Sequence, residues 1–146
     1  MATSHESADL VLKLYDLRRE ARMREGRDWF ALRFNPSTFQ EVTTVLEGPQ
    51  NAFFRMVVSY WDMAAALVNH GAIDEQLFTD TNAEHVAVFA KVAPFLADLR
   101  TALSNPDYLA QLERLVMRLP NAAARLAEVR ERFRELGVRL AETTAT

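Results

Sequence analysis

Apolar residues recur every three or four positions along most of this chain, and the clearest run lies near its C-terminal end. Seven of them follow spacings of 3, 4, 3, 4, 3 and 4: Leu119, Ala122, Leu126, Val129, Phe133, Leu136 and Leu140. Such spacing keeps one apolar seam on one side of a helix for about six turns. The pattern therefore predicts a terminal helix over residues 120–141, covered either by the first helix of the same chain or by a second copy.

The same spacing, interrupted by four glycines and five prolines, predicts the other elements. We expect six further helices, over residues 7–33, 36–46, 51–69, 75–78, 83–103 and 107–119. Gly26 indicates a loosening within the first of them, and Gly71 is typical of a left-handed helix end. Pro94 lies inside the fifth, where it removes a backbone donor, so we expect a kink or a break there.

The helix over residues 51–69 is apolar on most of its faces. Two neighbouring stripes cover it, one with Phe53, Val57, Tyr60, Ala64 and Leu67 and the other with Phe54, Val58, Trp61, Ala65 and Val68. A helix of this kind lies in the middle of a bundle. The chain is therefore predicted to be a single helical domain, 1–146, with an all-α fold: a bundle of five to seven helices with residues 51–69 at its centre and the first and last helices paired along their seams.

Composition excludes several kinds of chemistry. The chain has 146 residues, of which 49% are hydrophobic and none is cysteine. Disulfides, thiol nucleophiles and iron–sulfur clusters are thereby excluded, and a reducing cytoplasm fits the composition. The net charge is −3, and residues 41–84 carry seven acidic side chains against the single arginine Arg55, which makes nucleic acid a poor partner.

No segment has the pattern of a membrane span. The most apolar window, residues 52–68, contains Arg55 and Asp62 and is shorter than the roughly twenty residues that a bilayer-spanning helix needs. The first thirty residues lack a basic segment followed by an apolar one, so they show no secretion signal. We therefore expect a cytoplasmic protein.

Arg55, Ser59 and Asp62 are the interior polar residues of the apolar helix, and their spacings of 4 and 3 place them on one narrow face. If this face lines a cavity, Arg55 can hold an anion and Asp62 can act as its counter-charge. If it faces water, the three residues are a thin solvated strip or an internal salt bridge. They are the candidate ligand-binding residues of the sequence.

A second candidate is the group formed by His70, Asp74, Glu75 and Glu84, near the connection that follows residues 51–69. Histidine and carboxylates together can bind a hard or borderline metal ion. No motif with metal-ligand spacing occurs in the chain, so helix capping and solvated charges are the favoured interpretation. No phosphate-binding glycine loop and no serine nucleophile elbow is present either, and the sequence predicts no cofactor, metal or catalytic residue.

Charged residues flank the terminal seam: Arg125, Glu128, Arg132, Glu135 and Arg139. Such neighbours are typical of a helix–helix contact. The pattern favours a non-catalytic soluble interaction module with a protein partner or a second copy as its target. The alternative is a helical protein, an enzyme included, that binds a small ligand or a metal through the Arg55, Ser59 and Asp62 face or through the His70 group.

One stretch of the chain carries a family resemblance. Its features are Tyr60-Trp61-Asp62, Leu67, Gly71, Ile73-Asp74 and Leu77-Phe78, followed by Asn105-Pro106, Tyr108 and Leu112-Glu113. Over residues 38–116 the sequence resembles a family of uncharacterised bacterial helical proteins, some of which carry an N-terminal membrane anchor; we expect no such anchor here. The resemblance implies a helical bacterial domain, and it supplies no site residues because the family has no assigned activity.

Overall fold

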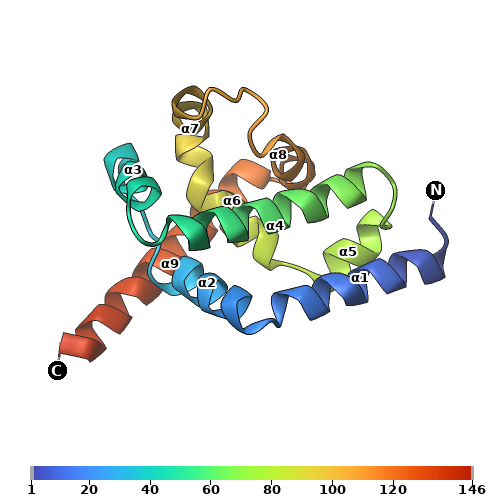
Figure 1. The fold of residues 1–146 in the computed structure, drawn as a ribbon, viewed down its shortest axis with the longest axis horizontal. Coiled ribbons are helices and arrows are strands. Elements are labelled where there is room, and N and C mark those ends of the chain that lie inside the picture. The colour runs from blue at the N-terminus through green and yellow to red at the C-terminus, as the bar shows by residue number, and fades with distance from the viewer. Residues whose placement is uncertain (1, 146) are drawn as a thin grey trace.

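The computed structural model describes residues 2–145, which form helices joined by short connections and contain no strand (Figure 1). In chain order the elements are α1 (Ser4–Arg18), α2 (Ala21–Leu32), α3 (Phe39–Glu47), α4 (Asn51–Asn69), α5 (Glu75–Thr81), α6 (Glu84–Val92), the 3₁₀ turn η1 (Ala93–Phe95), α7 (Leu96–Ala102), α8 (Ala110–Met117) and α9 (Ala122–Ala145). The all-α fold class is confirmed. The described residues form more than the expected five to seven helices because two of the expected helices are each divided.

The first division falls at Glu20, and the expected loosening at Gly26 is wrong. Glu20 leaves the helical conformation, and its carboxylate accepts hydrogen bonds from the backbone N–H groups of Arg22 at 3.0 Å and Met23 at 2.9 Å. These bonds satisfy donors that the start of a helix leaves free, so α2 begins here as a separate helix. Gly26 instead lets α4 approach, since a Cβ at this position would lie 2.7 Å from the Met56 Cε atom.

The second division falls at Pro94 and was expected. Pro94 lies in η1, between α6 and α7, where the ring excludes a regular helical hydrogen bond. Gly71, just beyond α4, has φ of +80°, which confirms the left-handed end of that helix.

The middle of the molecule is α4, as the sequence predicts (Figure 1). It packs mainly on α2 and α8, and also contacts α3, α5 and α6. Its side chains Phe54, Val57, Trp61, Ala64 and Ala65 are fully buried. Tight packing of this helix on several neighbours explains why its sequence is apolar on most faces.

The terminal helix α9 starts against the body and extends beyond it, at the lower left of Figure 1. It packs mainly on α6 and to a smaller extent on α2, so the expected pairing with residues 7–33 holds only for the α2 part of that segment. Burial of its seam decreases along the helix: Leu126 is buried, Phe133 is half-buried and Leu140 is exposed. No helix of the described residues has the length and hydropathy needed to cross a membrane.

Candidate functional site

A cavity of about 720 Å³ lies between α2, α6 and α9. Apolar side chains from these helices and from α4 form most of its wall: Phe30, Ala31, Val57, Val86, Ala87, Val88, Val129, Phe133 and Leu136. Sites for small molecules in proteins have volumes of about 300–1,000 Å³ and mostly apolar linings with a few polar groups. Part of the terminal seam therefore lines a cavity of ligand size.

Lys91 of α6 lines this cavity and is only 3% exposed. Its Nζ atom donates hydrogen bonds to the carbonyl oxygens of Phe30 at 2.6 Å and Ala31 at 2.8 Å, in the last turn of α2. The same atom lies 4.6 Å from the centre of the Phe133 ring. A helix C-terminus and an aromatic face both favour a cation, so the two contacts offset part of the cost of burying this amine.

Lys91 has no carboxylate partner within residues 2–145, where the ion pairs all involve arginine. Burial lowers the pKa of Lys91 to about 7, because the charged form loses its hydration. The amine therefore changes its protonation near neutral pH. A lysine of this kind in a cleft is a candidate functional residue.

Charged side chains surround the cavity: Arg27, Glu84, Arg125, Glu128, Arg132, Glu135 and Arg139. Arg27 and Glu84 are paired with each other. When this pair is set aside, the three arginines of α9 and Lys91 stand against Glu128 and Glu135, so four positive groups face two negative ones. This balance favours an anionic ligand over a cationic one.

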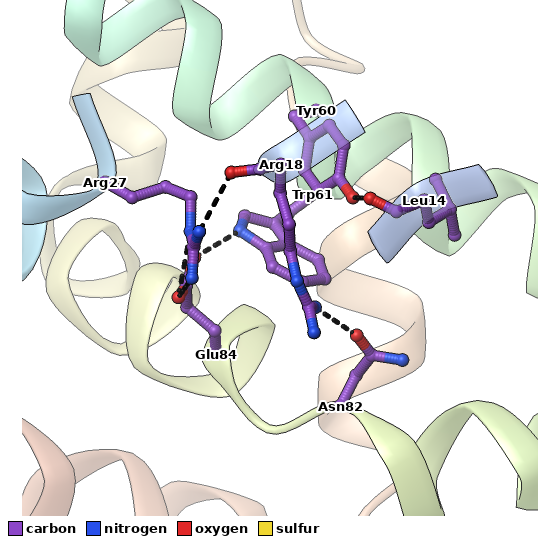
Figure 2. A network of polar contacts seen from close by, with 7 residues as sticks. All are labelled: Leu14, Arg18, Arg27, Tyr60, Trp61, Asn82 and Glu84. Atoms are coloured by element: carbon purple, nitrogen blue, oxygen red, sulfur yellow. Dashed lines mark hydrogen bonds and ion pairs between the residues drawn. The ribbon is translucent and has the colours of Figure 1, made fainter. Parts of the chain in front are cut away.

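Arg27 and Glu84, which line the cavity, belong to a network of polar contacts. Figure 2 shows this network. Arg27 Nη2 lies 2.8 Å from Glu84 Oε1, and Arg27 Nε lies 2.9 Å from Glu84 Oε2, which is a bidentate contact between α2 and α6. Arg27 Nη1 donates to the Arg18 carbonyl oxygen at 3.0 Å, and Trp61 Nε1 donates to Glu84 Oε2 at 3.2 Å. Through these bonds, Arg27 and Glu84 join four helices and have little capacity left for a ligand.

Two further bonds of this network fix α1 (Figure 2). Arg18 Nη1 donates to Asn82 Oδ1 at 2.5 Å, and the Tyr60 hydroxyl donates to the Leu14 carbonyl oxygen. Burial raises the pKa of Tyr60 to about 12, so the hydroxyl stays protonated and continues to donate at neutral pH. The network thus positions helices, and Lys91 takes no part in it.

His85 of α6 lies close to this network and is also buried. Its ring centre is 4.9 Å from that of Phe78 and 5.9 Å from that of Trp61, and its Nδ1 atom has no hydrogen-bond partner among the described residues. Burial lowers the pKa of His85 to about 4, so the ring is neutral at physiological pH. His85 does not line the cavity and acts as an aromatic residue of the core.

Sequence reasoning did not select Lys91, although one signal was present. Residues 86–93 contain seven apolar side chains, and Lys91 is the single charge among them. A charged residue in such a run has apolar neighbours on every helical face, which indicates burial. This signal points to a buried amine without identifying the cavity, because α2 and α9 lie far away in the sequence.

The structure brings the predicted residues Arg55, Ser59 and Asp62 together along a second, more open depression of about 690 Å³. Across from them, the loop before α8 contributes Asn105, Asp107 and Tyr108. Burial, with a smaller effect of the Asp62 charge, raises the pKa of Tyr108 to about 12. The three predicted residues thus share one face and one depression.

Two of the three are engaged in local structure. Asp62 Oδ1 accepts the backbone N–H of Leu112 at 2.9 Å and so caps α8, since the residue at the N-cap position, Leu109, provides no side-chain cap. Ser59 Oγ donates to the Met56 carbonyl oxygen at 3.3 Å, while Arg55 is exposed. Ligand binding by this face stays a prediction.

The His70 group is dispersed in the structure. Asp74 caps α5 by accepting the Leu77 N–H at 2.9 Å, which confirms the capping interpretation for this residue. Glu75 pairs with Arg118 at 2.7 Å, and Glu84 pairs with Arg27 in the network described above. Over residues 2–145, no cluster of three or more histidine and carboxylate side chains has an arrangement that could hold a metal ion.

Comparison with known proteins gives a family and no activity. Residues 3–119 match the model of a family described as a domain of unknown function, DUF4760. No curated protein and no solved structure matches the chain. The matched segment spans α1–α8 and ends before α9. The cavity walls from α2, α4 and α6 therefore lie within the matched segment, and the wall from α9 lies outside it. The resemblance to an uncharacterised family is confirmed, and the chain belongs to the DUF4760 family of domains of unknown function.

Proposed function

We propose that this protein binds a small amphipathic anion in the cavity between α2, α6 and α9. The observation that carries the proposal is the buried amine of Lys91, which faces an apolar cavity without a carboxylate partner among the described residues. Burial of an unpaired charge costs several kcal/mol, and an anionic ligand supplies the missing counter-charge.

The lining indicates the kind of molecule that fits. Phe30, Val129 and Leu136 offer apolar surface to the body of a ligand, and Arg132 and Arg139 lie beside them on α9. Guanidinium groups bind carboxylate and sulfonate oxygens through charge-assisted, often bidentate hydrogen bonds. The predicted class is therefore an organic acid with an aromatic or aliphatic body.

The test uses 1-anilinonaphthalene-8-sulfonate, whose fluorescence rises in apolar sites, with its neutral analogue N-phenyl-1-naphthylamine as comparison. We expect the wild-type protein to bind the sulfonate more tightly than the neutral analogue. Lys91→Met should weaken sulfonate binding by at least about tenfold, since a charge-assisted hydrogen bond contributes about 1.5–3 kcal/mol. The matched control is Arg55→Gln, which changes the other depression and should leave binding unchanged.

Two results would refute this function. The first is equal binding of the sulfonate to wild type and Lys91→Met, and the second is equal affinity for the neutral analogue. Near-ultraviolet circular dichroism of each variant must show a native signal, because loosely folded states also bind the dye.

A second candidate function is self-association through the distal part of α9. The observation that favours it is the exposure of Leu140 at 39% and Val138 at 54%, beyond the part of the seam that the body covers. A second copy packed on the seam would cover these side chains, and the charged residues beside the seam would lie at the edge of that contact: Arg125, Glu128, Arg132, Glu135 and Arg139.

Light scattering tests this second candidate. If a second copy covers the seam, the wild-type protein is a dimer, and Leu140→Asp converts it to a folded monomer because a charge replaces an apolar contact. A monomeric wild-type protein at concentrations of about 100 µM would exclude a dimer of micromolar affinity.

A further inference from the structure

The chain contains two lysines, and the structure gives them opposite environments. Lys13 lies on α1 and is exposed, whereas Lys91 is buried and lines the cavity. A neutral amine is a nucleophile toward carbonyl carbon, and a lysine in an apolar pocket is the usual form of an imine-forming residue.

The contacts of Lys91 hold its nitrogen in a defined orientation. Two N–H bonds point to the carbonyl oxygens of Phe30 and Ala31, at 2.6 Å and 2.8 Å. In the neutral amine, the lone pair occupies the remaining tetrahedral position and is directed away from these acceptors. The ring of Phe133, which also lines the cavity, lies on α9 at 4.6 Å from Nζ.

We propose that Lys91 forms an imine with an amphipathic aldehyde or ketone whose anionic end is held by the arginines of α9. The proposal rests on the anion site proposed above and adds the chemistry of its amine. The carbonyl group lies at the Lys91 end of the molecule, and the acidic group lies toward Arg132 and Arg139.

The reaction needs no further reactant. The lone pair of Nζ attacks the carbonyl carbon and forms a C–N bond while the carbonyl electron pair moves to oxygen, and a proton passes from nitrogen to that oxygen to give a carbinolamine. Loss of the hydroxyl group with a second proton, as water, then forms the C=N bond. The apolar wall excludes bulk water and so slows hydrolysis of the imine.

The protonation of Lys91 permits this step near neutral pH. Burial lowers the pKa of Lys91 to about 7, so about half of the amine is neutral at pH 7. The other charged groups that face the cavity are Arg27 of α2, Glu84 of α6 and, on α9, Arg125, Glu128, Arg132, Glu135 and Arg139. When the acidic group of the substrate is held by Arg132 and Arg139, its carbonyl carbon faces the amine.

The experiment uses 4-formylbenzoate, an aromatic aldehyde with a carboxylate, together with sodium cyanoborohydride, which reduces an imine to a stable amine. Peptide mapping by mass spectrometry then measures labelling at Lys91 and at Lys13 separately. In the native protein at pH 7, we expect Lys91 to be labelled at least about tenfold faster than Lys13, because an ordinary lysine is almost wholly protonated there. The rate at Lys91 should rise as the pH passes through about 7, following the pKa of this residue.

Two variants complete the design. Lys13→Arg should leave the labelling of Lys91 unchanged. Lys91→Arg should still bind the sulfonate dye, because it keeps a cation in the cavity. The aldehyde should no longer label this position. Preferential labelling of Lys13 in the native protein, or labelling of Lys91 only in urea, overturns the imine.

Binding of benzene-1,4-dicarboxylate, which lacks the aldehyde, separates this inference from the proposed function. If this diacid displaces the dye and Lys91 stays unlabelled in the native protein, the anion site stands and the imine is wrong. If neither the dye nor the diacid binds, both proposals fail.

Discussion

Lys91→Met should change how the stability of the protein depends on pH. The folded protein releases the Lys91 proton near pH 7, whereas the unfolded chain keeps it up to about pH 10.5. Between these two values the unfolded state binds more protons, so the free energy of unfolding of the wild-type protein rises with pH. The methionine variant has no amine at this position and lacks this contribution.

The size of the effect follows from the two pKa values. For folded and unfolded values of about 7 and 10.5, linkage gives a gain of about 2 kcal/mol between pH 7 and pH 9 for the wild type relative to Lys91→Met. For a chain of this length, such a gain corresponds to a relative increase of roughly 5–8 °C in Tm.

The assay is urea denaturation of both proteins at pH 7, 8 and 9, with Lys13→Met as the matched control. Lys13 is exposed, so the free energy of unfolding of this control should change with pH as it does for the wild type. If the free energies of unfolding of the wild type and of Lys91→Met change with pH by the same amount, the reasoning is refuted. That result would mean that Lys91 has the same pKa in the folded and the unfolded chain.

Four further outcomes are expected. Trp61→Ala should cost about 3–5 kcal/mol, measured by urea denaturation, because this fully buried side chain lies at the centre of α4; an unchanged Tm would show that α4 is peripheral. Asp62→Ala should cost about 1 kcal/mol through loss of the α8 cap, and equal stability would argue against that role. Phe133→Asp should be less destabilising than Phe133→Asn below pH 7, because its carboxylate lies close to the Lys91 ammonium group; the reverse order in Tm would contradict this contact. EDTA should leave Tm unchanged, and a decrease of several degrees that zinc reverses would restore a metal at the His70 group.

Local patterns in the sequence predict much of the fold. The two apolar stripes of residues 51–69 place this helix at the centre, since most of its faces must be covered. Pro94 and Gly71 end or divide helices through their own backbone restrictions, which act at any position in any fold. The division at Glu20 was missed because glutamate is a good helix former, and only its side-chain bonds to Arg22 and Met23 make it a cap.

The candidate site follows less directly, because it depends on contacts between distant segments. Arg55, Ser59 and Asp62 share a face through helical spacing alone, yet the capping role of Asp62 depends on α8, fifty residues further along the chain. The seam of α9 predicted a covering helix, and the structure places α6 beneath it. Spacing determines which side chains share a helix face, whereas the identity of the facing helix depends on the packing of the whole domain.

The environment of Lys91 depends both on the local sequence and on contacts with distant segments. Its apolar neighbours in residues 86–93 indicate burial, but its interactions come from α2 carbonyls and from a ring on α9. The family match covers α2 and α6 and ends before α9. The carbonyl contacts to Lys91 therefore belong to the matched segment, whereas the Phe133 contact and the arginines beside the cavity come from the helix outside it. If anion binding depends on these arginines, it is a property that α9 adds to this chain, and Arg132→Gln should weaken binding of the sulfonate dye without changing the titration of Lys91.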